Sequence, residues 1–334
     1  MAIKLSENDL LEKLGRIAKA ATRPPRTGSQ LRLGIGDDAA VFRPSPGSET
    51  VLTCDWFLEG MHFLREAHPP DSVGWKCLAR ALSDLAAMGA IPKCFLLSLA
   101  LPPSCTGPWL DGFLNGLRRA SRKLHCPLVG GDTTRHERVL LNLTVVGELP
   151  AGTAVLRSGA RVGDYIYVSG RLGEAELGLR LLRKGQTHLA GRINPGLRKH
   201  LYPQPRLKLG HWLRERNLAT SMMDLSDGLS TDLNRLCAAS LVGARLELAR
   251  IPVIGGLGDQ IKGLSLLNLA LHGGDDYELL FTVSRKKANR LPGSFEGVAL
   301  TRIGEITSGE RIQIALPDGR KKLLLPGGWD PFRK

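Results

Sequence analysis

The sequence predicts an α+β fold divided into two domains. Its 334 residues exceed the roughly 100–200 residues of a typical domain. Helical and strand patterns mix in both halves without simple alternation, which favours α+β over a doubly wound parallel sheet. A stretch rich in glycine and small residues, 149–164, lies between the halves. We therefore expect one domain over 1–150 and another over 151–334.

The first half is expected to begin with a helix and two short strands. Ser6 and Asp9 have the spacing of a capping box, and prolines end the helix at Pro24 and Pro25. The apolar side of this helix would consist of Leu10, Leu11, Leu14 and Ile17. Strands are predicted over 38–43 and 49–55, on either side of the turn PSPGSE.

Longer elements complete this half. Asp71 is expected to cap a long helix that ends at Gly89. Its apolar side would consist of Val73, Leu78, Leu82 and Leu85. A buried strand is predicted over 94–101, a helix over 109–124 and a long strand over 138–149.

The second half is expected to mix the same kinds of element. Helices are predicted over 173–185 and 227–240, and a segment punctuated by proline occupies 193–206. Strands are predicted near 164–170, 220–226, 244–249, 277–283, 298–305, 311–316 and 321–325.

The composition is that of a globular protein with reduced thiols. Hydrophobic residues make up 43% of the chain, and no apolar run approaches the roughly 18 residues that cross a membrane. The N-terminal residues MAIKLSENDLLEKL lack the apolar core of a signal peptide. The six cysteines form no CxxC pair, which argues against a zinc ribbon. We expect a cytoplasmic protein.

The net charge of +14 favours an anionic ligand, either a nucleic acid or a small substrate such as a nucleotide. The densest basic groups, at 117–123 and 285–287, are short enough to be solvated helix faces. Aromatic residues make up only 5% of the chain, which leaves few platforms for stacking bases. We therefore expect small anionic substrates, without a nucleic-acid or membrane partner.

Carboxylates gather where strands end and turns begin. They are Asp37, Asp38, Asp55, Asp84, Asp132, Asp224, Asp227, Asp275 and Asp276. Each stands beside or near glycine or serine in an otherwise apolar segment, where an isolated charge would be costly. Divalent cations bound among them would relieve their repulsion. Ligands that offer only oxygen favour Mg²⁺ over Zn²⁺.

A second pattern favours phosphate binding. Gly130 and Gly131 follow an apolar strand and would let backbone N–H groups approach a phosphate. Thr133 and Thr134 add hydroxyl donors, and Arg157 offers a forked contact to phosphate oxygens. Metal ligands, phosphate donors and an arginine together indicate phosphoryl transfer from a nucleotide.

Several nucleotide-binding classes are excluded. The chain has neither the GxxxxGK[ST] of P-loop enzymes nor the HRD and DFG motifs of protein kinases. GIGDDA fits the loose GxGxxA pattern of dinucleotide sites. Such a site needs a helix to follow, whereas AAVFRP has the pattern of a strand.

Eight segments, in order along the chain, carry a resemblance to a known family. They are LGIGDDAAVF, TCDWFLEGMHF, ALSDLAAMGAIP, VGGDTTR, RSGARVGDYIYVSG, DLSDGLSTDL, GGDDYELLF and GGWDPF. In them the chain resembles the thiamine-monophosphate kinases over nearly its whole length. This family is similar to aminoimidazole-ribonucleotide synthetase, selenophosphate synthetase and a hydrogenase-maturation protein, with which it forms a superfamily.

The resemblance implies an activity and an architecture. Such kinases use ATP and Mg²⁺ to phosphorylate thiamine monophosphate to thiamine diphosphate. An N-terminal domain with a mixed sheet would bind ATP and Mg²⁺ and pair in a homodimer, and a C-terminal α/β sandwich would complete the active site. The acceptor phosphate is partly ionised near neutral pH, its second pKa being about 6. Direct in-line transfer without a strong general base is therefore expected.

The resemblance also implies a role for each matching residue. Several Mg²⁺ ions would be held by Asp38, Thr53, Cys54, Asp55, Asp84, Asp132, Asp224 and Asp227. ATP would meet Gly131, Asp132, Arg157 and Ser226. Thiamine phosphate would meet His62, Asp275 and Trp329. The catalytic groups would be Asp132, Asp227 and Arg157.

At two positions the chain departs from the family pattern. Cys54 stands where a hydroxyl residue is usual. A thiol is a poor Mg²⁺ ligand, so Cys54 is expected to offer its backbone carbonyl or nothing. Asp275 stands where glutamate is usual, which keeps the charge and shortens the reach of the side chain.

Three alternatives stay open. One is a sister ATP-dependent enzyme of the superfamily, such as a selenophosphate or aminoimidazole-ribonucleotide synthetase. A selenophosphate synthetase would need a reactive cysteine near its N-terminus, whereas the first cysteine here is Cys54. The others are a non-catalytic nucleotide-binding relative and a nucleic-acid-binding protein, the latter suggested by the net charge.

Overall fold

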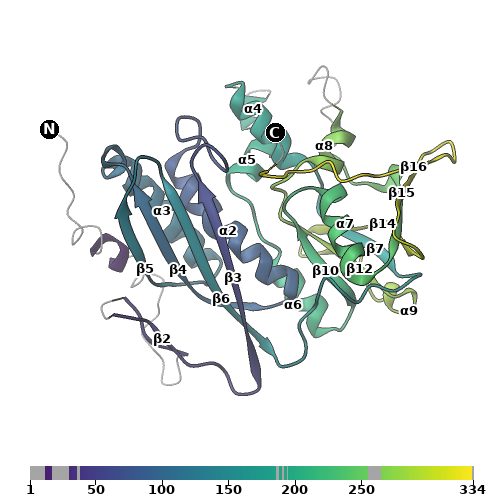
Figure 1. Cartoon of the computed structure of the whole chain (residues 1–334), viewed down its shortest axis with the longest axis horizontal. Coiled ribbons are helices and arrows are strands. Elements are labelled where there is room, and N and C mark those ends of the chain that lie inside the picture. The colour runs from purple at the N-terminus through teal and green to yellow at the C-terminus, as the bar shows by residue number, and fades with distance from the viewer. Residues whose placement is uncertain are drawn as a thin grey trace. The chain divides into compact units, whose positions relative to one another are not determined.

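The structure is a computed structural model that describes residues 12–16, 30–35, 38–185, 188–189, 192–193, 195–254 and 265–332. The chain divides into two compact units. The first comprises Met1–Leu85 and Ala90–Thr153, and the second comprises Ala86–Gly89 and Ala154–Lys334. Each unit combines helices with sheets (Figure 1), which confirms the α+β class.

The first unit is built on a four-stranded mixed sheet with the strand order β3-β6-β4-β5. The strands are β3 (Ser48–Leu58), β4 (Ile91–Leu101), β5 (Leu128–Arg135) and β6 (Leu140–Pro150). β6 pairs antiparallel with β3 and β4, whereas β4 and β5 run parallel. Two helices, α2 (Pro70–Met88) and α3 (Pro108–Lys123), cover one face of this sheet (Figure 1).

Alternation along the strands decides which sheet face is buried. In β3, Phe57 is fully buried, whereas Leu52 and Trp56 are 67% and 56% exposed. The core between this sheet and the two helices includes Phe57, Phe95, Leu97, Leu99, Leu141, Leu143, Val145, Leu78, Leu82, Phe113 and Leu117. The other face of the sheet therefore presents apolar side chains to solvent.

Small elements complete the first unit. β1 (Leu31–Leu33) and β2 (Val41–Phe42) pair antiparallel in a sheet of their own. A 3₁₀ turn, η1, covers Pro103–Cys105. Residues 12–16 are helical, within the helix predicted at the N-terminus. The other residues on which that prediction rests, from Ser6 to Pro25, lie outside the described residues.

The second unit is built on an eight-stranded sheet with the order β10-β12-β7-β14-β11-β15-β16, in which β13 pairs with β14. The strands are β7 (Tyr165–Ser169), β10 (Ala219–Leu225), β11 (Gly243–Glu247), β12 (Glu278–Val283), β13 (Ser294–Phe295), β14 (Val298–Thr307), β15 (Ile312–Ala315) and β16 (Lys321–Leu323). A separate hairpin joins β8 (His188–Leu189) and β9 (Arg192–Ile193). Most pairs are antiparallel, and β11 with β15 is parallel.

Helices cover both faces of this sheet, which confirms the predicted α/β sandwich. They are α4 (Glu174–Arg183), α5 (Pro195–Leu201), α6 (Leu207–Glu215), α7 (Leu229–Ser240), η2 (Leu248–Arg250), α8 (Leu266–His272) and α9 (Arg285–Ala288). Leu233 of α7 packs in one core with Val168 of β7. Leu213 of α6 packs in another core with the neighbouring Tyr167. Because side chains alternate across a strand, these two cores lie on opposite faces.

Three predictions about local structure are wrong. The strand expected over 38–43 is only β2, because residues 38–39 form a bend. Asp71 does not cap its helix, since Pro70 already begins α2 and the Asp71 carboxylate pairs with Arg119 of α3 at 2.5 Å. The residues VGGDTTR do not follow an apolar strand but themselves form most of β5, because their backbone pairs with β4.

Among the described ranges, no helix is both long enough and apolar enough to cross a bilayer. All six cysteines carry free thiols, and five of them are buried.

Candidate active site

In the first unit, three candidate metal ligands lie on the helix-facing side of β3 and on α2. The Thr53 hydroxyl donates to Asp84 Oδ2 at 2.5 Å. Asp55, two residues after Thr53 and so on the same side of the strand, lies with its Oδ2 3.4 Å from Arg80 Nε. Arg80 precedes Asp84 by one helical turn. The structure thus brings Thr53, Asp55 and Asp84 to one side of one strand.

Cys54 lies on the opposite side of β3 from these ligands. Its thiol is exposed and donates to Asn142 Oδ1 of β6 at 3.2 Å. The Thr144 hydroxyl lies 3.7 Å from the same sulfur. The Cys54 side chain therefore does not share the side that carries Thr53 and Asp55.

A hollow of about 1000 Å³ in the first unit brings other candidates together. Asp38, Gly130, Gly131 and Thr133 line it, along with Leu14, Ile35, Ala39, Ala40, Leu96, Leu97, Leu128 and Val129. Asp132 is exposed, and its Oδ1 accepts a hydrogen bond from Thr133 N at 2.9 Å. Asp37, the neighbour of Asp38, lies outside the described residues.

Gly131 is required by the pairing of β5 with β4. Its φ is +153°, and a Cβ added there would lie 1.9 Å from the carbonyl oxygen of Leu97. No side chain fits against that backbone. The close approach of two strands therefore explains this glycine, whether or not a phosphate also approaches it.

His62, a candidate for contact with thiamine phosphate, lies in the turn after β3 and is half-buried. Its Nδ1 accepts a hydrogen bond from Leu58 N at 2.9 Å, and its ring centroid lies 5.8 Å from that of Phe57. The neutral ring therefore carries its proton on Nε2.

In the second unit, Asp224 and Asp227 stand where β10 ends and α7 begins. Asp224 is buried near the end of β10. Asp227 Oδ2 accepts a hydrogen bond from Arg235 Nη1 of α7 at 2.5 Å. The same Nη1 donates to Asp232 Oδ1 at 2.9 Å.

Asp232, which sequence reasoning missed, shapes the loop that carries Ser226 and Asp227. Its Oδ2 accepts the backbone N–H groups of Ser226, Asp227 and Gly228 at 3.1, 3.0 and 3.1 Å. Burial, followed by the charge of Asp227, raises the pKa of Asp232 to about 7. A single buried carboxylate thus gathers three successive amides, and this fixes the loop.

Backbone hydrogen bonds join this loop to the two other candidate segments of the second unit. Asp275 N donates to Ser226 O at 2.8 Å, and Trp329 N donates to Asp227 O at 2.9 Å. The Trp329 side chain is 48% exposed. Residues that are distant in sequence, from DLSDGLSTDL, GGDDYELLF and GGWDPF, therefore lie side by side.

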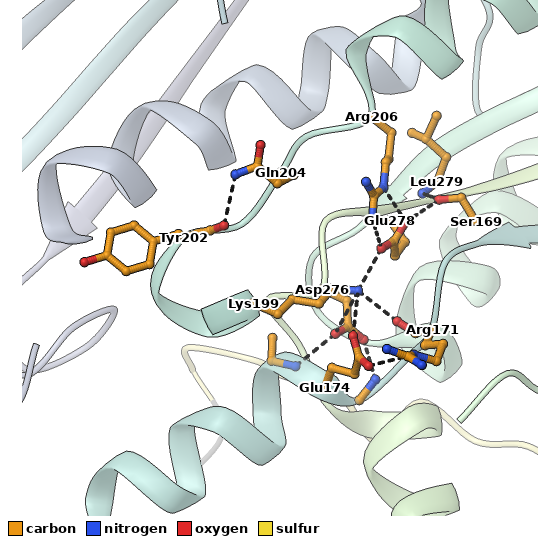
Figure 2. Close-up of polar contacts among 12 residues, drawn as sticks. Ser169, Arg171, Glu174, Lys199, Tyr202, Gln204, Arg206, Asp276, Glu278 and Leu279 are labelled. Carbon is orange, nitrogen blue, oxygen red and sulfur yellow. Dashed lines mark hydrogen bonds and ion pairs between the residues drawn. The ribbon is translucent and has the colours of Figure 1, made fainter. Parts of the chain in front are cut away.

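The Asp275 carboxylate is held by its neighbours. Oδ1 accepts a hydrogen bond from the Tyr277 hydroxyl at 2.7 Å, and Oδ2 lies 3.7 Å from Nδ1 of the buried His200. Asp276 and Glu278, which follow closely, enter a buried cluster of charged side chains (Figure 2). Arg157, by contrast, is exposed, and its backbone carbonyl accepts a hydrogen bond from Ser240 Oγ at 2.9 Å.

Two of the candidate carboxylates, Asp55 and Asp227, are paired with arginines, and the candidates do not gather into one cluster among the described residues. Taken over the described residues, no three His, Cys, Asp or Glu side chains converge in a way that could hold a metal ion. Asp55 faces Arg80, and Asp227 faces Arg235. Each unit therefore offers oxygen ligands next to an arginine that balances their charge.

Comparisons with known proteins point to one family. Residues 36–149 match the N-terminal domain of the AIR synthase related proteins, and residues 161–316 match the C-terminal domain. The chain is 40% identical over 294 residues to the thiamine-monophosphate kinase of Buchnera aphidicola subsp. Acyrthosiphon pisum. That similarity covers 87% of this chain and 89% of the relative.

Solved structures give the same result. The crystal structure of the thiamine-monophosphate kinase from Stenotrophomonas maltophilia K279a is similar, with a TM-score of 0.82 and 34% identity, over 95% of this chain and 98% of that one. A structure described as AaThiL complexed with AMPPCP and TMP is similar over 99% of both chains, with a TM-score of 0.77 and 30% identity.

Proposed function

This chain belongs to the thiamine-monophosphate kinases, among the AIR synthase related proteins, and we propose on that ground that it phosphorylates thiamine monophosphate with ATP. The products are thiamine diphosphate and ADP. One observation carries the proposal: the structure with AMPPCP and TMP, an ATP analogue and the substrate named in the family, resembles this chain over 99% of its length.

We propose that Mg²⁺ takes part and that oxygen ligands of this chain hold it. The chemistry of the donors fits the ion, because Thr53 Oγ1 and Asp84 Oδ2 are hard oxygen atoms that already adjoin at 2.5 Å. The further ligands would come from Asp38, Asp55, Asp132, Asp224, Asp227 and the backbone of Cys54. Bound Mg²⁺ would neutralise charge on the phosphate oxygens.

We assign the two substrates to separate residues. Gly131, Asp132, Arg157 and Ser226 would meet ATP. His62, Asp275 and Trp329 would meet thiamine phosphate. The thiazolium ring carries a positive charge that the Asp275 carboxylate would offset, and the exposed indole of Trp329 offers a face for a flat ring.

The reaction follows from the charges of the reactants. The acceptor is a phosphate monoester that is already partly ionised near neutral pH, so its oxygen can attack the γ-phosphorus directly and in line. The main obstacle is repulsion between two anions. Arg157, together with metal held by carboxylates such as Asp132 and Asp227, would lower that repulsion.

We also propose an assembly and a compartment. The domain expected over 1–150 would bind ATP and Mg²⁺ and pair with a second copy through the open face of its sheet, where Leu52 and Trp56 are exposed. The domain expected over 151–334 would complete the active site. The free thiols of all six cysteines support a reducing compartment, the cytoplasm.

The test is product formation. The purified chain is incubated with ATP, Mg²⁺ and thiamine monophosphate, and the products are separated by chromatography. Thiamine and a precursor of aminoimidazole ribonucleotide are supplied in parallel reactions. We expect thiamine diphosphate and ADP from thiamine monophosphate only, and no product when EDTA is present. Turnover of the aminoimidazole precursor instead would assign the chain to a sister reaction.

A further inference from the structure

A buried cluster of charged side chains surrounds Glu278, which is fully buried at the start of β12 (Figure 2). Its Oε1 accepts from Lys199 Nζ at 2.7 Å and from Arg206 Nη2 at 2.5 Å, and its Oε2 accepts from Arg206 Nε at 2.7 Å and from Ser169 Oγ at 2.5 Å. Burial raises the pKa of Glu278, but the two cations outweigh burial and hold the pKa below its usual value. The carboxylate is therefore charged and depends on both partners.

The cluster is packed without spare room. Gly170 lies beside it with a φ of +61°, and a Cβ added there would lie 2.3 Å from Glu278 Oε1. Arg206 binds the carboxylate in the forked geometry that a guanidinium allows, since its Nε and Nη2 donate to different oxygens. Several short hydrogen bonds therefore fix the position of the Glu278 carboxylate.

Asp276, two residues before Glu278, is anchored in the same way. It is also buried, and its two oxygens accept the backbone N–H groups of Gly173 at 2.5 Å and Ala175 at 3.1 Å, where α4 begins. Lys199 Nζ lies 3.9 Å from Asp276 Oδ1 and 2.7 Å from Glu278 Oε1. One ammonium group therefore attracts both anchored carboxylates.

Between and before these anchors, the backbone adopts a conformation that ordinary residues avoid. Asp275 has a φ of +68° and Tyr277 a φ of +50°. A left-handed conformation is unfavourable for a non-glycine residue, so it persists where the surroundings fix it. Asp276 follows Asp275, and Glu278 follows Tyr277. The anchored side chains of Asp276 and Glu278 therefore hold the backbone of Asp275 and Tyr277 in this conformation.

The constraint reaches the carboxylate of Asp275 by two routes. Tyr277 is buried, and its hydroxyl donates to Asp275 Oδ1 at 2.7 Å. The second route runs through α5, which places Lys199 against Glu278 and the next residue, His200, 3.7 Å from Asp275 Oδ2. A shift of α5 or of β12 would therefore move the groups that surround Asp275.

We propose that Lys199 and Arg206 are positioning residues for substrate binding: their contacts with Glu278 set the place of the Asp275 carboxylate. This inference rests on the proposed function, in which Asp275 meets thiamine phosphate. Neither cation contacts the substrate. Both act through Glu278 and the left-handed turn that precedes it.

The test measures the KM for thiamine monophosphate and the KM for ATP separately. Arg206→Met removes the forked contact and leaves Lys199 in place. We expect the KM for thiamine monophosphate to rise about tenfold or more, because a misplaced charged hydrogen-bonding group costs that much. The KM for ATP and kcat should stay within about twofold. Arg206→Lys keeps the charge and loses the fork, so its KM should fall between those of the wild type and Arg206→Met.

Lys208→Met is the matched control. Lys208 lies on α6, two residues after Arg206, and its ammonium group pairs with Glu296 at the surface. Its side chain is 77% exposed, so its loss should leave both KM values unchanged. A rise in the KM for thiamine monophosphate in both variants would assign the effect to lost surface charge and overturn the proposal.

A second variant guards against misfolding of the first. Tyr277→Phe removes only the hydroxyl that donates to Asp275 Oδ1 and leaves the cluster intact. It should raise the KM for thiamine monophosphate in the same direction. A wild-type KM in both Tyr277→Phe and Arg206→Met would overturn the proposal.

Hydrogen exchange provides a readout that does not need activity. Asp275 N and Tyr277 N donate to Ser226 O and Leu225 O at 2.8 Å, so both amides should exchange slowly. In Arg206→Met the peptide over 273–279 should exchange faster than in Lys208→Met, while a peptide from β4 should not change. Equal exchange in the two variants would contradict the positioning role. If the wild type forms no thiamine diphosphate, the proposed function fails, and exchange still tests the turn.

Discussion

Asp227 is the residue through which the proposed chemistry can be tested most directly. Its carboxylate accepts from Arg235, and its backbone carbonyl accepts from Trp329 N. Asp227→Asn keeps the size of the side chain and the backbone contact but removes the charge that would attract Mg²⁺. We expect kcat to fall about 100-fold or more, measured as thiamine diphosphate formation over a range of Mg²⁺ concentrations.

Asp318→Asn provides the control for that measurement. Asp318 pairs with Arg320 in an exposed turn of the second unit. Losing the same charge there should leave kcat and the Mg²⁺ dependence unchanged. If Asp227→Asn kept the full wild-type kcat at the same Mg²⁺ concentration, Asp227 would not be a metal ligand.

The role of Asp232 could not be predicted from the sequence. It belongs to the segment DLSDGLSTDL, five residues after Asp227, and from the sequence it resembles any polar residue at the start of a helix. Its importance comes from three backbone amides that converge on one oxygen, and convergence depends on φ and ψ. Arg235, three residues further along α7, could have been found from its spacing, since side chains three apart on a helix adjoin.

At the scale of elements, Gly131 determines whether β4 and β5 can pair. A methyl group in Gly131→Ala would meet the Leu97 carbonyl oxygen at 1.9 Å, and the obstacle is backbone, which cannot rotate away. We expect the free energy of unfolding to fall by about 3 kcal/mol, measured by urea denaturation. Gly293→Ala, which has an ordinary φ and nothing within 4 Å, should change it by less than about 0.5 kcal/mol. Equal stability of the two variants would contradict this account of β5.

The start of α4 gives a pH-dependent prediction. Burial raises the pKa of Asp276 from 3.8 to about 6, against the pull of Lys199. A raised folded-state pKa means that the folded protein binds the proton more tightly. The stability from this protonation is therefore full below about pH 4 and is lost as the pH rises through 6. Glu278, whose pKa is lowered, has the opposite dependence and loses its contribution in acid.

Asp276→Asn isolates this contribution. Between pH 4 and pH 7 the wild type should lose stability relative to the variant, by on the order of 3 kcal/mol for the shift of about two pKa units. The free energy of unfolding of both proteins is compared at each pH by urea denaturation. If the difference in free energy of unfolding between the two proteins stayed constant from pH 4 to pH 7, the pKa of Asp276 would not be raised in the folded protein.

Elements with clear periodicity were predictable, and elements defined by their partners were not. The helix predicted over 109–124 is α3 (Pro108–Lys123), and the strand predicted over 138–149 is β6 (Leu140–Pro150). By contrast, α5 lies inside the segment that was predicted only as punctuated by proline. Its seven residues pack against α4 and contribute Lys199 to the ion cluster, and a sequence pattern displays neither partner.

For the molecule as a whole, the order of the motifs along the chain was enough to recognise the family. Which motifs contact one another in the fold could not be predicted from the sequence. Asp275 and Ser226 are 49 residues apart and share a backbone hydrogen bond. Nothing in either segment specifies the other, because backbone donors and acceptors are the same in every residue. The sheet order, with β10 beside β12, creates this meeting.

Assembly of the protein is expected to depend on the open face of the sheet in the first unit. Leu52 and Trp56 are 67% and 56% exposed on β3, and Ile91 and Leu96 are 44% and 37% exposed on β4. Several large apolar side chains exposed on one sheet face are typical of a surface that another protein covers. We expect a second copy of the chain to cover it, since a face that pairs with itself forms a closed dimer.

Light scattering coupled to size-exclusion chromatography measures the outcome. The wild type should have twice the mass of one chain, and the double variant Leu52→Glu/Trp56→Glu should have the mass of one chain, because burying two like charges at a twofold interface is unfavourable. Leu241→Glu, at an 85% exposed position in the second unit, should remain a dimer. A monomeric wild type, or a double variant that remains a dimer, would show that this face is not where the copies meet.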